Sequence, residues 1–144
     1  MSIPKPVTAV SPGVHRNAEI LRAIYTDLTR IGEYASDDIV LHAAERDLVD
    51  GRYVGKQAVV AKERELLRLT GNTLVMDVEH IIANDYFGAV IGVLRAHGED
   101  VILAVPFCGL WRFRDGLIVE HWENAYEISA LTRFAAHENP PTPA

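Results

Sequence analysis

The sequence predicts an α+β domain in which helices come first and a curved antiparallel sheet is wrapped over them. Apolar residues recur at helical spacing in two early segments, and from residue 72 onward they alternate with polar residues at a period of two. Near the end, Asp115-Gly116 joins two long alternating segments, and this dipeptide is typical of a tight hairpin. Because the predicted helices lie in the first half of the chain and the strands of a meander in the second half, we expect a sheet packed on one layer of helices.

Length and composition predict a single domain. The chain has 144 residues, of which 49% are hydrophobic, and this is enough to bury a core without disulfides or a metal ion. Prolines punctuate both ends, so we expect an irregular arm over residues 1–12 and an irregular tail over residues 137–144. No repeat, low-complexity tract or linker interrupts residues 13–136, which should form the domain.

The first half of the domain should contain two helices around a short strand. The predicted elements are a helix from about Ser11-Pro12 or Asn17 to residue 31, a strand over residues 39–42, and a helix over residues 57–69. The segment between the strand and the second helix should be a loop or a short extended arm, because it contains Gly51 and Gly55. Within the second helix, Lys62-Glu63-Arg64-Glu65 is interpreted as a solvated face of mixed charge.

Four long antiparallel strands and a last short helix should complete the domain. The predicted strands cover residues 74–82, 86–97, 101–114 and 117–126, and the helix covers residues 129–136. On the third of these strands the bulky residues share one face, which should look into a core or a pocket. The opposite face carries Ile102, Ala104 and Leu110, which is too apolar to face water alone.

The last strand is less regular, because neither of its faces is purely apolar. Glu120 and Trp122 should share one side with Ile118, while His121 and Glu123 share the other. If Glu120 points inward, it is a carboxylate in an apolar pocket and a plausible base near neutral pH. In the other orientation, His121 and Glu123 point inward. Either pair could instead lie on a solvated or dimer-facing surface.

Charge and cysteine content narrow the classes of partner. The net charge is −6, the pI is about 5.4 and no basic stripe stands out, so no nucleic-acid partner is expected. The start of the chain has no apolar block of signal-peptide length, and no segment approaches the length of a membrane span, so no membrane association is expected. The single cysteine, Cys108, excludes an internal disulfide and suits a reducing compartment. These features together predict a cytoplasmic protein.

Three motifs, together with the order of elements, carry a resemblance to a known family. They are Ala35-Ser36-Asp37-Asp38-Ile39-Val40-Leu41-His42, Gly51-Arg52-Tyr53-Val54-Gly55-Lys56 and Trp111-Arg112-Phe113-Arg114-Asp115-Gly116-Leu117-Ile118-Val119-Glu120-His121-Trp122. Over roughly residues 14–135 the chain resembles the SnoaL-like branch of the nuclear transport factor 2-like, or ketosteroid isomerase-like, superfamily. The resemblance implies a cone-shaped α+β barrel of cystatin-like type, a pocket between sheet and helices, and a homodimer formed through the sheet.

The resemblance does not carry a known catalytic residue set onto this chain. The general base of ketosteroid isomerase would fall at Ala43 and its oxyanion-hole aspartate near Gly109, so both acids are missing. The resemblance places its first-helix tyrosine at Tyr25. The catalytic aspartate of the polyketide cyclases is replaced by Tyr126 followed by Glu127. A mechanism copied from either enzyme is therefore not implied.

Candidate site residues have to be chosen on their own chemistry. His42, His80 and Glu120 are the candidate acid–base residues, since an imidazole or a buried carboxylate can titrate near neutral pH. His42 could equally be a strand-end histidine bonded to the following loop, and His80 a satisfied core histidine. The expected pocket walls are Tyr25, Tyr53, Phe107, Trp111, Trp122, Asn124 and Tyr126. The six histidines are scattered, so no metal and no cofactor are expected.

Two classes of function follow from this. The first is a cofactor-independent isomerase, dehydratase or cyclase that acts on a small hydrophobic molecule of polyketide, steroid or terpenoid type. The second is a non-catalytic module that uses the same cone to hold a ligand or to dimerise. Polar groups interleaved with aromatic residues on the last strand favour the enzyme, and the missing aspartates favour the module.

Overall fold

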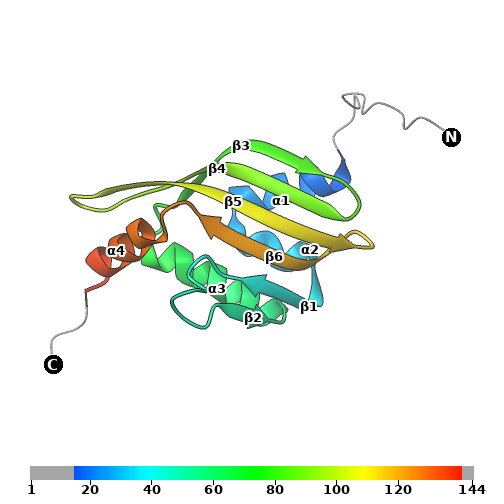
Figure 1. Cartoon of the computed structure of the whole chain (residues 1–144), viewed down its shortest axis with the longest axis horizontal. Helices are drawn as coiled ribbons and strands as arrows, with labels where there is room; N and C mark the ends of the chain where they lie inside the picture. Colours follow the sequence, from blue (N-terminus) through cyan, green and yellow to red (C-terminus); the bar gives the residue numbers. More distant parts are fainter. Residues whose placement is uncertain (1–14, 141–144) are drawn as a thin grey trace.

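The computed structural model describes residues 15–140, which form a six-stranded sheet over a layer of helices (Figure 1). The elements are α1 (Arg16–Thr26), a 3₁₀ turn η1 (Leu28–Arg30), α2 (Ile31–Tyr34), β1 (Ala35–His42), β2 (Arg52–Val54), α3 (Lys56–Leu69), β3 (Val75–Ala83), β4 (Phe87–His97), β5 (Ile102–Arg114), β6 (Leu117–Ala125) and α4 (Ile128–Glu138). The predicted arm over residues 1–12 lies outside the described residues, and α4 extends into the predicted tail.

The sheet has the order β2-β1-β6-β5-β4-β3, and β3 to β6 form the predicted antiparallel meander. The sheet is curved and open, and Figure 1 shows α1 and α2 behind it. The Asp-Gly hairpin is confirmed, because Asp115 and Gly116 have φ of 53° and 80°, as a tight two-residue turn requires. β1 is longer than predicted and pairs in parallel with β6, which brings the first strand beside the last.

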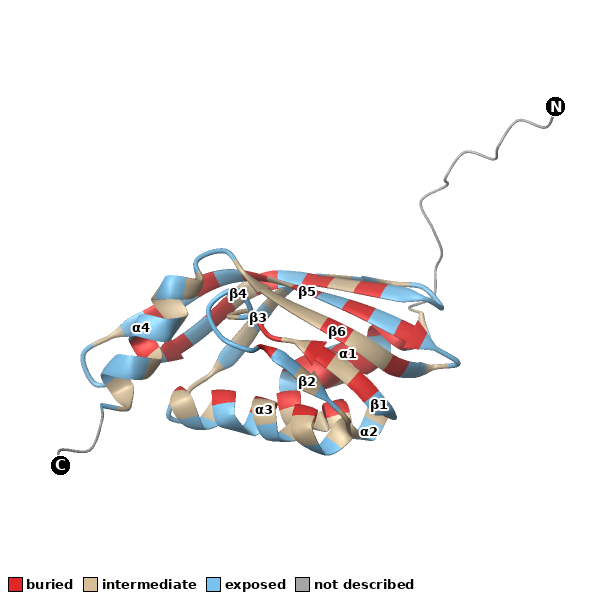
Figure 2. Cartoon of the chain, turned by 60° about the horizontal axis from the view of Figure 1, so that its bottom comes forward, coloured by how far each residue is buried: buried red, intermediate tan, exposed pale blue. Residues whose placement is uncertain are grey.

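The helices bury apolar stripes against the inner face of the sheet. Ile20, Leu21 and Ile24 of α1 are buried, and this helix packs on β3 and β4. α3 packs on β1 and β2 through Val59 and Leu66. Figure 2 shows buried and exposed positions alternating along β5, whose buried side chains close the core from above. Each fully buried large side chain of this kind stabilises the fold by about 1.5–3 kcal/mol.

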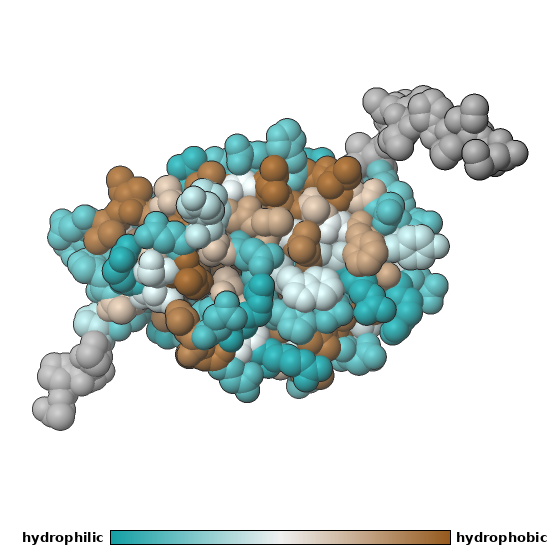
Figure 3. Space-filling view, in the orientation of Figure 1, coloured by the Kyte–Doolittle hydropathy of each residue, from teal (hydrophilic) through white to brown (hydrophobic). Residues whose placement is uncertain are grey.

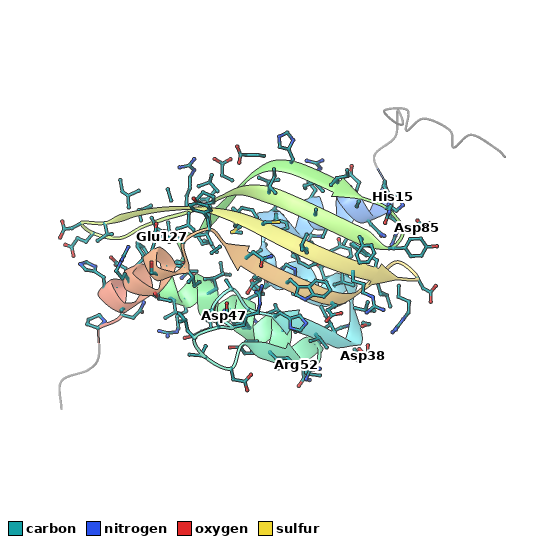
Figure 4. All side chains as sticks on the ribbon, in the orientation of Figure 1. His15, Asp38, Asp47, Arg52, Asp85 and Glu127 are labelled. Carbon is teal, nitrogen blue, oxygen red and sulfur yellow. The ribbon has the colours of Figure 1, made fainter. Side chains whose placement is uncertain are left out.

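The first helix begins at Arg16, next to the predicted start at Asn17, and ends earlier than predicted. Its N-cap is His15, whose Nδ1 accepts a hydrogen bond from the Asn17 amide at 2.9 Å. The other ring nitrogen donates to Asp85 at 2.8 Å, and Figure 4 shows these two side chains together where α1 meets the β3–β4 turn. The helix ends at Thr26 because Asp27 is extended, with φ of −157°, and its side chain caps the 3₁₀ turn that follows.

Two β-bulges decide which side chains face the helices. In β3 the register shifts between Val78 and His80, and in the β5–β6 pair it shifts between Arg112 and Phe113. A strict alternation would put His80 on the same face as Val78. The bulge instead turns His80 outward beside Ile91 and leaves it exposed, so its predicted place on the apolar stripe is wrong.

Candidate functional site

The second bulge settles the orientation of β6. Ile118 pairs with Phe113 and Glu120 pairs with Arg112, so Val119 is the extra residue. Ile118 and His121 are therefore both buried, and Ile118 does not share a face with Glu120 as the sequence predicts. His121 and Glu123 point toward the helices, whereas Glu120 and Trp122 lie on the outer face of the sheet.

An interior cavity of about 50 Å³ lies between the sheet and the helices, and we call it the interior site. Its polar lining comes from α1, the β1–β2 loop, α3 and β6, and comprises Tyr25, Glu45, Lys62, His121, Glu123 and Asn124. Its apolar walls include Leu28, Leu66, Met76, Leu94, Phe107 and Leu131. An apolar cavity with a few convergent polar groups is the usual form of a small-molecule site.

His121 is a neutral imidazole in this site. Its ring stacks on the Trp111 indole with centroids 3.4 Å apart, and Nδ1 donates to the Leu110 carbonyl at 2.9 Å. Burial lowers the pKa of His121 to about 3, because the charged ring would lose its hydration, although the Leu110 carbonyl opposes this. With the proton on Nδ1, Nε2 carries the lone pair and is the basic nitrogen.

Tyr25 provides a hydroxyl donor in the same cavity. The Trp111 indole N–H donates to the Tyr25 oxygen at 3.2 Å, and the phenol stacks on Phe107. A side chain at Gly109 would collide with the Tyr25 hydroxyl, so the glycine makes this close approach to β5 feasible. Burial raises the pKa of Tyr25, and the phenol therefore stays protonated and can donate its O–H to a ligand.

Two glutamates meet under β6. Glu63 of α3 is 3% exposed and Glu123 is partly buried, and loss of hydration is the main reason that the pKa of each carboxyl is raised. As a carboxylate, Glu63 would have no hydrogen-bond donor for either oxygen within residues 15–140. A hydrogen bond between the two carboxyls, with one of them protonated, resolves this. The Ala44 amide works weakly in the opposite direction and favours the charged form of Glu123.

Lys62 is the cation of the interior site. Its ammonium lies 3.2 Å from Glu45 and 5.9 Å from the centre of the Tyr53 ring. Burial works to lower the pKa of Lys62, but the nearby acids, Glu123 and Glu45 foremost, outweigh it, so the pKa is raised and the ammonium persists. The charge of Lys62 is thus balanced by carboxylates of the protein itself.

Two of the three predicted acid–base residues come together, but on the outer face. His42 Nε2 lies 2.7 Å from Glu120, and the His42 ring stacks on Trp122 with centroids 5.4 Å apart. Arg112 lies 3.4 Å from the other oxygen of Glu120. His80 is not part of this group, since β6, β5 and β4 separate its strand from β1.

The predicted walls divide in a similar way. Three of them, Tyr25, Phe107 and Asn124, line the interior cavity, and Trp111 packs directly behind it. Tyr53 is half-buried beside Lys62. Trp122 lies on the outer face because of the bulge, and Tyr126 is 88% exposed just beyond the end of β6, so neither lines the interior cavity.

The outer face of the sheet carries an open apolar groove of about 640 Å³, which we call the outer groove. One row of side chains crosses four strands in register, from Ile82 through Ala89 and Leu110 to Trp122. Arg46, Asn84 and Asn124 supply polar atoms at its ends. Figure 3 shows hydrophobic side chains gathered on this face, which is turned toward the viewer.

Sequence reasoning missed Glu63 as a site residue. Lys62-Glu63-Arg64-Glu65 was expected to be solvated, but Glu63 lies four residues after Val59 and three before Leu66, within the buried stripe. That spacing is the signal that could have identified it. His121 and Glu123 were candidates only through the alternative orientation of the last strand.

Within residues 15–140 no helix is long and apolar enough to cross a membrane. The same part of the chain contains no group of three or more histidine, cysteine or acidic side chains arranged to hold a metal ion.

Comparison with known proteins assigns the chain to a family. The family model described as SnoaL-like domain matches residues 22–121. A search of curated proteins gave no match. Bal32a, from a soil-derived mobile gene cassette, is 23% identical with a TM-score of 0.71, and the match covers 82% of this chain and 95% of Bal32a.

Two further solved structures are similar. A protein of unknown function with a cystatin-like fold from Xanthomonas campestris is 19% identical with a TM-score of 0.69, over 81% of this chain and 95% of that one. IdmH, a candidate polyketide cyclase from Streptomyces antibioticus, is 18% identical with a TM-score of 0.64, over 83% and 98%. At these identities the likeness establishes the fold.

Proposed function

Because the chain belongs to the SnoaL-like domain family, we propose that it is a cofactor-independent acid–base enzyme, an isomerase, dehydratase or cyclase, whose chemistry takes place in the interior site. One observation carries this proposal. A glutamate carboxyl, a neutral imidazole and a phenol donor, on Glu123, His121 and Tyr25, line the same cavity. These are the groups that abstract a proton next to a carbonyl and stabilise the oxyanion that results.

The proposed reaction begins with a substrate C–H bond next to a carbonyl group. Glu123 takes the proton, the electron pair of the broken bond moves to the carbonyl oxygen, and Tyr25 donates a hydrogen bond to that oxygen. Return of the proton from Glu123 to another carbon of a conjugated enolate gives isomerisation. Attack of the enolate carbon on a second carbonyl, whose oxygen then takes the proton from Glu123, gives cyclisation. The Trp111 N–H fixes the Tyr25 hydroxyl for this role.

The charges of the site favour an uncharged substrate. Lys62 is paired with Glu45 and lies close to the carboxyl pair, so its charge is already balanced. An anionic ligand would face Glu123 in a small, poorly hydrated cavity, where repulsion between like charges is costly. The apolar walls and the description of IdmH as a candidate polyketide cyclase support a hydrophobic ketone of polyketide type, with steroids and terpenoids as related choices.

Substrate entry requires the cavity to enlarge. A volume of about 50 Å³ holds only one or two water molecules. Leu131 brings a wall of the cavity from α4, the last helix of the described chain. We propose that α4 moves away from β5 when a ring-sized substrate enters, since a single terminal helix is the easiest of these walls to displace.

A screen for binding and turnover tests this function. Purified protein is mixed with uncharged steroid, terpenoid and aromatic polyketide ketones, and with carboxylated analogues of each, and thermal shift and mass spectrometry are recorded. We expect a neutral ketone to raise the melting temperature and to be converted, while its carboxylated analogue does neither. Conversion of the carboxylated compounds alone would refute the proposal.

The alternative function is a ligand-binding or dimerisation module without chemistry. The small cavity volume and the missing ketosteroid isomerase aspartates, at Ala43 and Gly109, favour it. In the same screen this alternative gives ligands that raise the melting temperature and are recovered unchanged. If every neutral ketone that binds is recovered unchanged, the non-catalytic module replaces the enzyme as the proposed function.

We further propose that the protein is a homodimer formed through the outer face of the sheet. Ile82, at one end of the apolar row, is 71% exposed, and Leu110, in its middle, is 43% exposed. Burial of about 800 Å² on each protomer is typical of a stable dimer, and the strands around the outer groove offer such a surface. Isologous pairing would cover the same residues on both copies.

Leu110→Asp should convert this dimer into a monomer. A carboxylate in the centre of the interface would lose its hydration without a partner, and we expect the dimer dissociation constant to rise at least about 10-fold. Sedimentation velocity across a range of protein concentrations measures the change. Leu48→Asp, at an exposed leucine of the β1–β2 loop, is the matched control and should leave the dimer intact. A wild type that sediments as a monomer at all concentrations would contradict the proposal.

A further inference from the structure

We infer that Glu63 and Glu123 hold one proton between them, and that Glu63 is the neutral partner whose O–H positions the Glu123 carboxylate. This inference deepens the proposed function, because it assigns a positioning residue to the proposed base. It concerns the protein without substrate, so it can be tested whether or not turnover is found.

The position of Glu63 in the fold is the first argument. It lies in the middle of α3, on the face that buries Val59 and Leu66 against the sheet. Both of its carboxyl oxygens are inaccessible, and within residues 15–140 neither has a hydrogen-bond donor if both glutamates are charged. A buried carboxylate without a donor is costly, whereas a protonated carboxyl that donates to a carboxylate is satisfied.

The second argument is the charge that surrounds the pair. Lys62 from α3, Glu45 from the β1–β2 loop, and the neutral Tyr25 and His121 also line the cavity or interact with the pair. With every glutamate ionised, three carboxylates would face one ammonium in an interior of low dielectric. A shared proton leaves two carboxylates, Glu45 and Glu123, for the one ammonium. Lys62 contacts Glu45 directly, so the second carboxylate needs another donor.

The two acids are not equivalent. Glu123 lines the cavity, while Glu63 is buried on the helix and does not line the cavity. The proton is therefore held on Glu63, and the charge on Glu123 faces a ligand. During the proposed reaction Glu123 receives a proton from the substrate carbon and returns it, and the Glu63 proton stays in place as the donor that aims the base.

The test measures proton binding through the pH dependence of unfolding, for wild type, Glu63→Gln and Glu65→Gln. Unfolded Glu63 titrates near its ordinary value of about 4.5, but the folded protein keeps the proton to a higher pH. Stability should therefore fall as the pH rises above about 4.5, with the folding constant decreasing about tenfold per pH unit relative to Glu63→Gln until the folded pKa is reached. His121 adds an opposite slope below about pH 6.5, which is present in every variant and cancels in the comparison.

The outcomes separate this inference from the proposed function. Glu65→Gln, on the exposed side of the same helix, should follow the wild-type slope. Equal slopes in wild type and Glu63→Gln would overturn the shared proton. If Glu63→Gln does not fold, carbon-13 NMR of the wild-type carboxyls decides, because both carboxyls titrating near pH 4.5 would also overturn it. If the shared proton is found but no substrate is converted, the inference holds and the proposed enzymatic function is refuted.

Once a substrate is known, a second readout follows from the positioning role. Glu63→Met removes the donor, and kcat should fall about 10-fold or more with KM little changed, while Glu63→Gln keeps an amide donor and should retain most of kcat. Equal losses in both variants would indicate a structural role instead of positioning.

Discussion

Glu123→Gln should lower kcat by about 10²–10⁴-fold for the ketone identified by the screen, because it removes the only interior-facing base that the proposed mechanism uses. The fold should survive the change. The glutamine oxygen can still accept from a protonated Glu63, so this contact is kept. Steady-state kinetics, together with a thermal unfolding curve for each variant, measures both expectations.

Glu120→Gln is the matched control for this experiment. It makes the same chemical change on the same strand, three residues away, but on the outer face beside His42. We expect it to retain turnover. Loss of activity in Glu120→Gln with full activity in Glu123→Gln would move the chemistry to the His42–Glu120 pair and would refute the interior site.

The sequence was sufficient for most of the fold. Helical spacing located α3 to within a residue, and the period-two segments located the four long strands, because these local patterns reflect burial on one face. The Asp115-Gly116 turn was predictable because a tight hairpin needs residues that tolerate positive φ. Parallel pairing of β1 with β6 was not, since it joins segments about 80 residues apart and has no local signature.

The candidate site was only partly predictable, and the reason is the bulge in the β5–β6 pair. A single extra residue, Val119, exchanges the faces of every side chain that follows, so it decides whether Glu120 or His121 points inward. The sequence narrowed the choice to two pairs but gave no signal for the bulge. In the same way, the bulge in β3 shifts the alternation of side chains by one residue and places His80 on the outer face.

Trp111→Ala should destabilise the protein by about 3–5 kcal/mol, the usual cost of truncating a large buried aromatic residue. Trp111 is 1% exposed and packs between Tyr25 and His121. The substitution opens a cavity and also removes the N–H donor from the Tyr25 hydroxyl. Urea unfolding followed by circular dichroism gives the change in the free energy of unfolding.

The second tryptophan provides the matched comparison. Trp122 lies on the outer face, is only partly buried, and stacks on His42 instead of core side chains. Trp122→Ala should therefore cost clearly less than Trp111→Ala in the free energy of unfolding, and should weaken self-association if the outer groove is the dimer interface. The two variants distinguish the roles of the two faces of the sheet. Trp111 packs in the core behind the interior site, whereas Trp122 contributes to the outer surface. Equal losses of stability in a monomeric background would contradict this division, because they would mean that Trp122 carries as much of the core packing as Trp111.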